Sequence, residues 1–160
     1  MMSKFRIGGF KALAARRKRM ASEDGNVLVE MALAVPAILL LFSGIVSFAS
    51  AFNHQLTLTQ AVGAGGQYLQ QLRGASTDPC ADAFTAIQNA APMLTPSQIS
   101  LTFTLNGKVI SGNTCSGDQT YLVEGAPVQI SATYPCALHA YGMNFANTCQ
   151  LSAQVTEYEY

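Results

Sequence analysis

A long, mostly apolar stretch dominates the pattern of hydrophobic and polar residues along this chain. It runs from Gly25 to Phe52, and no charged residue occurs between Met31 and Phe52. An α-helix rises about 1.5 Å per residue and needs about 20 consecutive apolar residues to cross a bilayer. The stretch is long enough to do so, and we therefore predict a membrane-spanning helix.

Beyond this stretch, apolar and small residues recur at helical spacing. Residues 53–55 are polar and mark the exit from the membrane, after which the pattern continues with Leu56, Thr59, Val62, Gly66, Leu69 and Leu72. We predict that the helix extends outward over residues 53–72 as an amphipathic rod. A cluster of three glycines can be interpreted in two ways, because it allows another backbone to approach closely but also weakens the helix enough to end it. These are Gly63, Gly65 and Gly66.

The remainder of the chain predicts a short helix and about four antiparallel strands. Asp78 followed by Pro79 is typical of a helix start, and Pro92 ends that helix. The pair Asn106-Gly107 predicts a hairpin turn, because both residues tolerate positive φ. Alternation predicts strands over residues 99–105 and 128–134 and a final strand from residue 151 to the C-terminus, with a further short one over residues 121–124. The hairpin turn predicts a return strand that starts with residues 108–111. We expect an α+β fold, in which a long N-terminal helix precedes a small antiparallel β domain.

Charge is distributed unevenly, although nine basic and nine acidic residues cancel overall. Seven basic residues precede the apolar stretch: Lys4, Arg6, Lys11, Arg16, Arg17, Lys18 and Arg19. From Asn26 onward two basic residues face seven acidic ones, a net charge of −5. A basic cluster beside a membrane span holds that side in the cytoplasm, so no nucleic-acid partner is needed to explain it. We divide the chain into a basic cytoplasmic leader (1–25), a transmembrane helix (26–73) and an exported domain (74–160).

All four cysteines follow the apolar stretch, and an even number on the exterior predicts two disulfides in an oxidising compartment. Three pairings are possible. Cys136 and Cys149 flank one irregular loop, so we pair them first, which leaves Cys80 with Cys115. No pair has C-x-x-C spacing and the two histidines stand apart, so neither a metal site nor a cofactor is predicted.

The chemistry expected of an enzyme is missing from the sequence. It contains no G-x-S-x-G, no H-E-x-x-H and no phosphate-binding loop. Asp78 and Asp82 lie at a predicted helix start, where carboxylates usually complement the helix dipole. We expect a protein that works through contacts, not catalysis.

The run GNVLVEMALAVPAILLLFSGIV, preceded by a basic leader, resembles the type IV pilin signal and, more closely, the start of TadE-like proteins. These are pseudopilins of the bacterial tight-adherence (Tad/Flp) pilus machinery. The resemblance implies that a prepilin peptidase cuts between Gly25 and Asn26, and that Glu30 is the fifth mature residue. Glu30 and Pro36 match the glutamate and proline of the pattern. Met31 stands where major Flp pilins have tyrosine, which favours a minor pseudopilin.

The resemblance also implies a place and partners. The chain would be a single-pass protein of the bacterial inner membrane, with a cytoplasmic N-terminus and a periplasmic C-terminal domain, either retained there or incorporated in the pilus. Its partners would be the prepilin peptidase, other pilins or pseudopilins, inner-membrane pilus assembly proteins and membrane lipid. We expect the protein to take part in pilus assembly, at initiation or at the pilus tip.

Glu30 is the one carboxylate within the stretch from Gly25 to Phe52, and a charge within a membrane span costs a few kcal/mol. After cleavage, the new ammonium group of Asn26 on an adjacent subunit could pair with it and set the register. A simpler interpretation places Glu30 at the lipid headgroups.

Processing could also differ in two ways. A signal peptidase cut after Ala51 would release a soluble domain beginning at Phe52, and an uncleaved chain would be a single-span structural component of an envelope machine.

Overall fold

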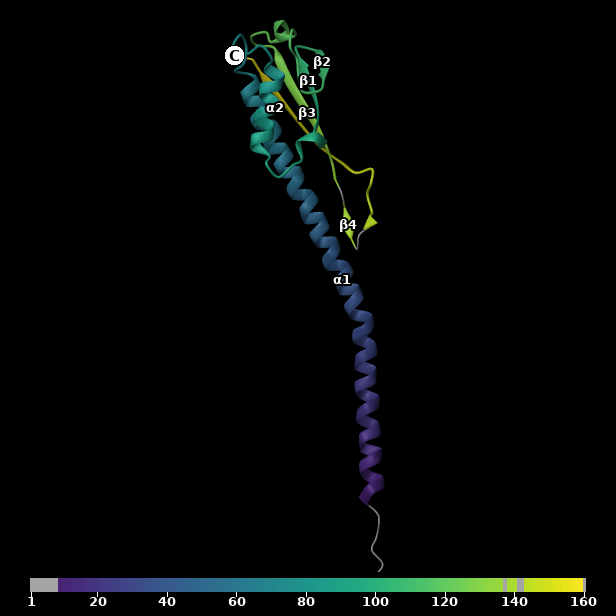
Figure 1. Cartoon of the computed structure of the whole chain (residues 1–160). Coiled ribbons are helices and arrows are strands. Elements are labelled where there is room, and N and C mark those ends of the chain that lie inside the picture. The colour runs from purple at the N-terminus through teal and green to yellow at the C-terminus, as the bar shows by residue number, and fades with distance from the viewer. Residues whose placement is uncertain (1–8, 137, 141–142, 160) are drawn as a thin grey trace, which may run out of the picture. The chain divides into compact units, whose positions relative to one another are not determined.

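The protein was analysed as a computed structural model that describes residues 9–136, 138–140 and 143–159, with side chains described for residues 25–136, 138 and 143–159. The chain divides into two compact units, residues 1–44 and residues 45–160. Helix α1 (Gly9–Leu69) contributes to both units (Figure 1). The predicted long N-terminal helix is confirmed, but it already begins at Gly9, inside the basic leader, and ends at Leu69 instead of residue 72.

The first unit consists of the part of α1 up to Gly44. Pro36 lies inside the helix. The side chains described here, from residue 25 onward, are almost all exposed. The mostly apolar sequence therefore forms a regular helix without forming a core of its own.

The second unit contains the last part of α1 and the short helix α2 (Pro79–Ala90). One face of α1 is buried, through Leu58, Ala61, Val62 and Leu69. Helix α2 starts as predicted, with Asp78 as N-cap and Pro79 in the first turn, and it buries Cys80, Ala83 and Ile87. Both helices thus present an apolar stripe at helical spacing.

The four-stranded sheet has the order β2-β1-β3-β6, and all neighbouring strands are antiparallel. Its strands are β1 (Ser100–Leu105), β2 (Lys108–Ser111), β3 (Pro127–Pro135) and β6 (Gln150–Tyr158). Asn106 and Gly107 join β1 to β2 with φ of 47° and 82°, the positive values that such a hairpin needs. The predicted α+β fold with four antiparallel strands is confirmed.

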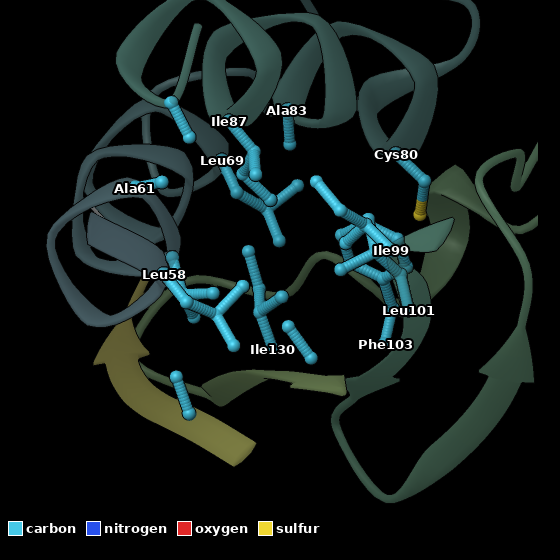
Figure 2. Close-up of a cluster of buried hydrophobic side chains, with 14 of the residues drawn as sticks. Leu58, Ala61, Leu69, Cys80, Ala83, Ile87, Ile99, Leu101, Phe103 and Ile130 are labelled. Carbon is cyan, nitrogen blue, oxygen red and sulfur yellow. The ribbon is translucent and has the colours of Figure 1, made fainter. Parts of the chain in front are cut away.

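The core lies between the two helices and one face of the sheet. Figure 2 shows Leu58 and Ala61 of α1 and Ala83 and Ile87 of α2 on one side, with Phe103, Leu101 and Ile130 of the sheet facing them. Alternation along β3 is strict: every second residue from Val128 to Tyr134 is buried. The intervening positions of β1, β3 and β6 carry serine, threonine and glutamine on the other face.

Two sequence predictions about the connecting segments are wrong. Residues 121–124 do not form a strand: a 3₁₀ turn, η2 (Gln119–Tyr121), precedes them, and a turn ends at Gly125, which has φ of 74°. A strand needs a neighbour to accept its hydrogen bonds, and no described strand pairs with this segment. The loop between Cys136 and Cys149 is not wholly irregular, because β4 (His139–Ala140) and β5 (Met143–Asn144) form a small hairpin. A second 3₁₀ turn, η1 (Pro96–Gln98), leads into β1.

Candidate functional site

The most unusual surface of the described chain is the apolar stretch of α1. Large hydrophobic side chains are exposed along it at nearly every position, including Val27, Leu33, Ile38, Leu41, Phe42, Ile45 and Phe48. A soluble protein rarely exposes a contiguous apolar surface of this extent. Among the described residues one helix is long and apolar enough to cross a membrane, and it covers Gly25–Leu69. The stretch therefore suits lipid, or other apolar helices, on all sides.

The N-terminal end of this stretch carries the predicted processing site and the predicted assembly glutamate. Gly25 is helical, and a Cβ added there would meet no atom within 4 Å. Asn26 and Glu30 are exposed on the same helix. Glu30 has no salt bridge with any residue whose side chain the structure describes. Its position near the start of an apolar helix thus leaves its carboxylate open to an external partner, while the basic side chains of the leader lie outside the described side chains.

Pro36 interrupts the hydrogen bonding of α1 without ending the helix. A proline has no backbone N–H, so the carbonyl of Ala32, four residues earlier, lacks its usual donor. In a membrane such a carbonyl must find a donor elsewhere or be shielded. Pro36 therefore marks a second polar position within the apolar stretch, six residues beyond Glu30.

The other end of the stretch is attached firmly to the domain. The side-chain amide of Gln55 donates a hydrogen bond of 2.7 Å to the backbone carbonyl of Ser152 on β6. The ring of His54 meets the ring of Tyr134 edge-on, with centroids 6.0 Å apart. These contacts lie where the sequence predicts the membrane exit, so polar side chains on α1 become partners of the sheet as soon as the apolar stretch ends.

Two of the three clustered glycines allow close packing of α1. A Cβ at Gly65 would meet the side chain of Ile87 on α2, and one at Gly66 would come within 2.7 Å of Val155 Cγ1 on β6. A Cβ at Gly63 would meet nothing within 4 Å. Of the two interpretations that the sequence allows, close approach is therefore correct for Gly65 and Gly66, and the helix continues through the cluster to Leu69.

These features lie within one recognisable sequence unit. Residues 25–67 match the family model of TadE-like proteins. No curated protein and no solved structure matches the chain. The TadE-like segment contains Gly25, Asn26, Glu30, Pro36 and the glycine cluster, and it ends where α1 has entered the core of the domain.

Outside the TadE-like segment, two disulfides constrain the domain. Cys80 pairs with Cys115 and Cys136 pairs with Cys149, with Cα–Cα distances of 5.4 Å and 5.2 Å. This is the pairing predicted from the sequence. In the chain-entropy model, loops of these lengths correspond to about 4 and 3 kcal/mol of stabilisation, respectively. The first bond fixes α2 to the loop after β2, and the second closes the loop that carries β4 and β5.

Asp78 connects the first disulfide to the helix that bears it. Its Oδ1 accepts hydrogen bonds from the backbone N–H of Ala81 at 3.2 Å and from that of Cys115 at 2.8 Å. The hydroxyl of Ser76 accepts from the N–H of Asp78 and donates to the carboxylate of Asp82. Asp78 thus acts as a helix cap and as a brace for the disulfide loop.

A buried carboxylate that was not predicted from the sequence lies just after β6. Glu159 is only 3% exposed, and neither of its carboxylate oxygens has a hydrogen-bond partner among the described residues. Burial raises the pKa of Glu159, and the positive charge of Arg73 partly offsets that rise. The signal was present, because Glu159 continues the alternation of Ala153, Val155 and Glu157 on the inner face of β6.

Proposed function

We propose that this chain is a membrane-anchored minor pseudopilin that takes part in assembly of the Tad/Flp pilus. The observation that carries the proposal is the TadE-like match over residues 25–67, which begins at Gly25 and includes Glu30. The exposed apolar surface of α1 supports it, because such a surface needs lipid or the apolar helices of other subunits around it. The role is structural: the chain contributes contacts, and the prepilin peptidase is its processing enzyme.

The orientation follows from the basic leader. Seven of the nine basic residues precede the apolar stretch, and basic residues flanking a span are retained in the cytoplasm. The N-terminus is therefore cytoplasmic in the inner membrane, and the disulfide-bonded domain lies in the periplasm, where disulfides form and persist.

Cleavage between Gly25 and Asn26 creates the functional end of the protein. The peptidase must first unwind the helix at this point, and Gly25 lowers the cost of doing so because glycine is the weakest helix former after proline. The new ammonium group of Asn26 then lies one turn from Glu30. Within the membrane, pairing of the Glu30 carboxylate with the ammonium group of a neighbouring subunit removes the cost of leaving either charge alone.

The mature N-terminus tests the proposal most directly. Intact-mass measurement or N-terminal sequencing of the protein purified from membranes should give Asn26 as the first residue. Gly25→Leu should block this cleavage without unfolding the helix, because space surrounds Gly25. A protein that begins at Phe52 would instead mean release by a signal peptidase, and an intact leader would mean an uncleaved single-span component; either would refute pseudopilin processing.

Glu30→Gln separates the assembly role from processing. The variant retains the shape of the side chain but cannot pair with an ammonium group as a charge. It should be cleaved and inserted normally while pilus production falls. Glu124→Gln is a matched control, since Glu124 is an exposed glutamate of the domain whose salt bridge with Arg73 at 3.0 Å lies on the surface. Normal pili with Glu30→Gln would exclude the pairing role.

A further inference from the structure

The loop closed by the Cys136–Cys149 disulfide carries exposed apolar side chains. Met143 on β5 is 59% exposed and Phe145, just after it, is 67% exposed. Neither contributes to the core of the domain. A disulfide-closed hairpin therefore presents two large apolar groups outward, which calls for an apolar partner.

The strand register places this loop at one particular end of the domain. β3 and β6 pair from Pro127↔Tyr158 at one end to Pro135↔Gln150 at the other, and the loop follows the second end. Helix α1 runs along β6 in the same direction as the strand numbering. Gln55 contacts Ser152, nearer the loop, and Gly66 lies against Val155, farther from the loop. The loop thus lies at the end from which α1 continues into its apolar stretch.

The loop and the apolar stretch share a groove. Its volume is about 230 Å³, and it is lined by apolar side chains and the second disulfide, with Gln55 as the one polar residue: Phe48, Ala51, Phe52, Gln55, Cys136, Leu138, Cys149 and Leu151. The β4–β5 hairpin and this part of α1 lie alongside each other in the second unit (Figure 1). Phe48 and Phe52 are themselves 72% and 63% exposed. The exposed apolar surface of α1 therefore continues onto the loop.

The two ends of the domain also differ in their content of charged residues. Residues 125–156 contain no aspartate, glutamate, lysine or arginine. At the opposite end, Arg73 pairs with Glu124, and Glu157 and Glu159 end β6. A surface that faces lipid must avoid such charges, since each costs several kcal/mol away from water.

We propose that Met143 and Phe145, in the described part of the Cys136–Cys149 loop, insert at the outer surface of the membrane, at the boundary between headgroups and acyl chains. The headgroup region is about 5–7 Å thick on each side of the bilayer. From Phe52, the last apolar residue of the stretch, to Gln55 the helix rises only about 4.5 Å. The groove that the loop and the helix share runs along the helix from Phe48 to Gln55 and so includes this zone, which places the loop near the depth of the lipid interface. The inference rests on the proposed membrane anchor.

The occupant is lipid because the groove and the loop are continuous with a surface that the bilayer must cover. The second disulfide suits this role, because it closes the loop and limits the entropy lost when the loop binds the interface. The contact would hold the domain against the membrane and would have to break before the subunit leaves the bilayer for a filament.

Fluorescence of single tryptophans tests the proposal, because the natural chain has none. The full chain is reconstituted in phosphatidylcholine vesicles, with and without lipid brominated near the headgroup, which quenches tryptophan on contact. The reporter is Phe145→Trp. Phe48→Trp reports on the membrane span, and Val109→Trp, on an exposed residue of β2 near the opposite end of the sheet, reports on water. Recovery of the Cys136–Cys149 peptide without reduction shows that each variant has folded.

We expect Phe145→Trp to emit at shorter wavelength than Val109→Trp and to lose most of its emission in brominated lipid, while Val109→Trp loses none. If Phe48→Trp is quenched and Phe145→Trp is not, the loop proposal is wrong and the membrane anchor stands. If Phe145→Trp is blue-shifted but unquenched, and the shift disappears on dilution in lipid, a second copy covers the loop and the proposal is again wrong. If neither is quenched, the membrane anchor itself is refuted.

Discussion

Replacing Gly65 with alanine should destabilise the domain, although alanine is the better helix former. A Cβ at Gly65 would lie 2.8 Å from Cδ1 of Ile87, closer still to its Cγ1, and 3.4 Å from the carbonyl oxygen of Ala83. Ile87 is fully buried. The same replacement at Gly63 adds a methyl group that meets nothing within 4 Å. The chain therefore offers a matched pair of variants in one helix, two residues apart.

The magnitudes follow from two opposing effects. Glycine-to-alanine replacement inside a helix gains up to about 1 kcal/mol of helix propensity. Forcing an extra methyl group into a well-packed core costs about 1–3 kcal/mol. Gly63→Ala should have only the gain, whereas Gly65→Ala should have both effects and a net loss of up to about 2 kcal/mol. Because the propensity gain is common to both variants, their difference of about 1–3 kcal/mol isolates the packing cost.

Thermal unfolding of the full chain in mild detergent, followed by near-UV circular dichroism of its six tyrosines, measures this difference. For a domain of this size, 1 kcal/mol corresponds to a shift in Tm of about 4 °C. We expect the Tm of Gly65→Ala to lie several degrees below that of Gly63→Ala. Equal midpoints would refute the inference that the glycine is required for contact between α1 and α2.

Ile87→Ala sharpens the test, because it removes both Cγ1 and Cδ1, the two side-chain atoms that a Cβ at Gly65 would meet. Alone it should cost about 2–5 kcal/mol through the cavity it leaves. In the Gly65→Ala background the same change should cost less or even stabilise the domain. The coupling energy from this double-mutant cycle should be favourable, and additive effects would mean that the two residues do not press on each other.

Two further variants examine polar groups of the domain. Burial raises the pKa of Glu159 above its ordinary value of 4.5. The stabilisation linked to the protonated carboxyl is therefore complete below pH 4.5, and it is lost as the pH rises through the raised pKa. Glu159→Gln should therefore raise the Tm at pH 7 but not at pH 4, and an equal effect at both would contradict the assignment. Asp78→Ala removes the acceptor for the N–H groups of Ala81 and Cys115 and should cost about 1–2 kcal/mol in chemical unfolding. Asn89→Ala, at an exposed position of the same helix, should cost about 0.5 kcal/mol or less, and equal losses would contradict the bracing role of Asp78.

The sequence predicted the elements whose signals are local. Strict alternation identified β1 and β3, the Asn106-Gly107 pair identified the turn from β1 to β2, and Asp78-Pro79 identified the start of α2. The pairing of Cys136 with Cys149 could be predicted because the two residues flank one loop, and the other pair followed by elimination. Residues 121–124 show where this reasoning fails, because alternation alone does not say whether a neighbouring strand is available.

The features that depend on tertiary contacts could not be predicted in the same way. Three glycines within four residues look alike in the sequence, yet Gly65 and Gly66 face α2 and β6 while Gly63 faces open space. The helical spacing identified part of the face of α1 that meets the domain, since Val62, Gly66 and Leu69 are buried. It was wrong for Leu56 and Thr59, which are exposed, because the packing of the sheet and α2 decides which face is covered. The exposure of Met143 and Phe145 is equally a property of the folded loop, since both are apolar residues that a sequence would assign to a core.

The helix α1 combines two surfaces with opposite requirements, and the polar residues at 53–55 separate them. Before that point its side chains are apolar and exposed, which suits lipid. After it, Leu58, Ala61 and Val62 are buried in the core, so the domain cannot complete its core without this helix. A rotation or shift of the last turns of α1 would therefore be transmitted to the domain through Gly65 and Gly66, because at these positions the helix backbone packs directly against α2 and β6. The chain thus couples the packing of its domain to the end of its long apolar helix.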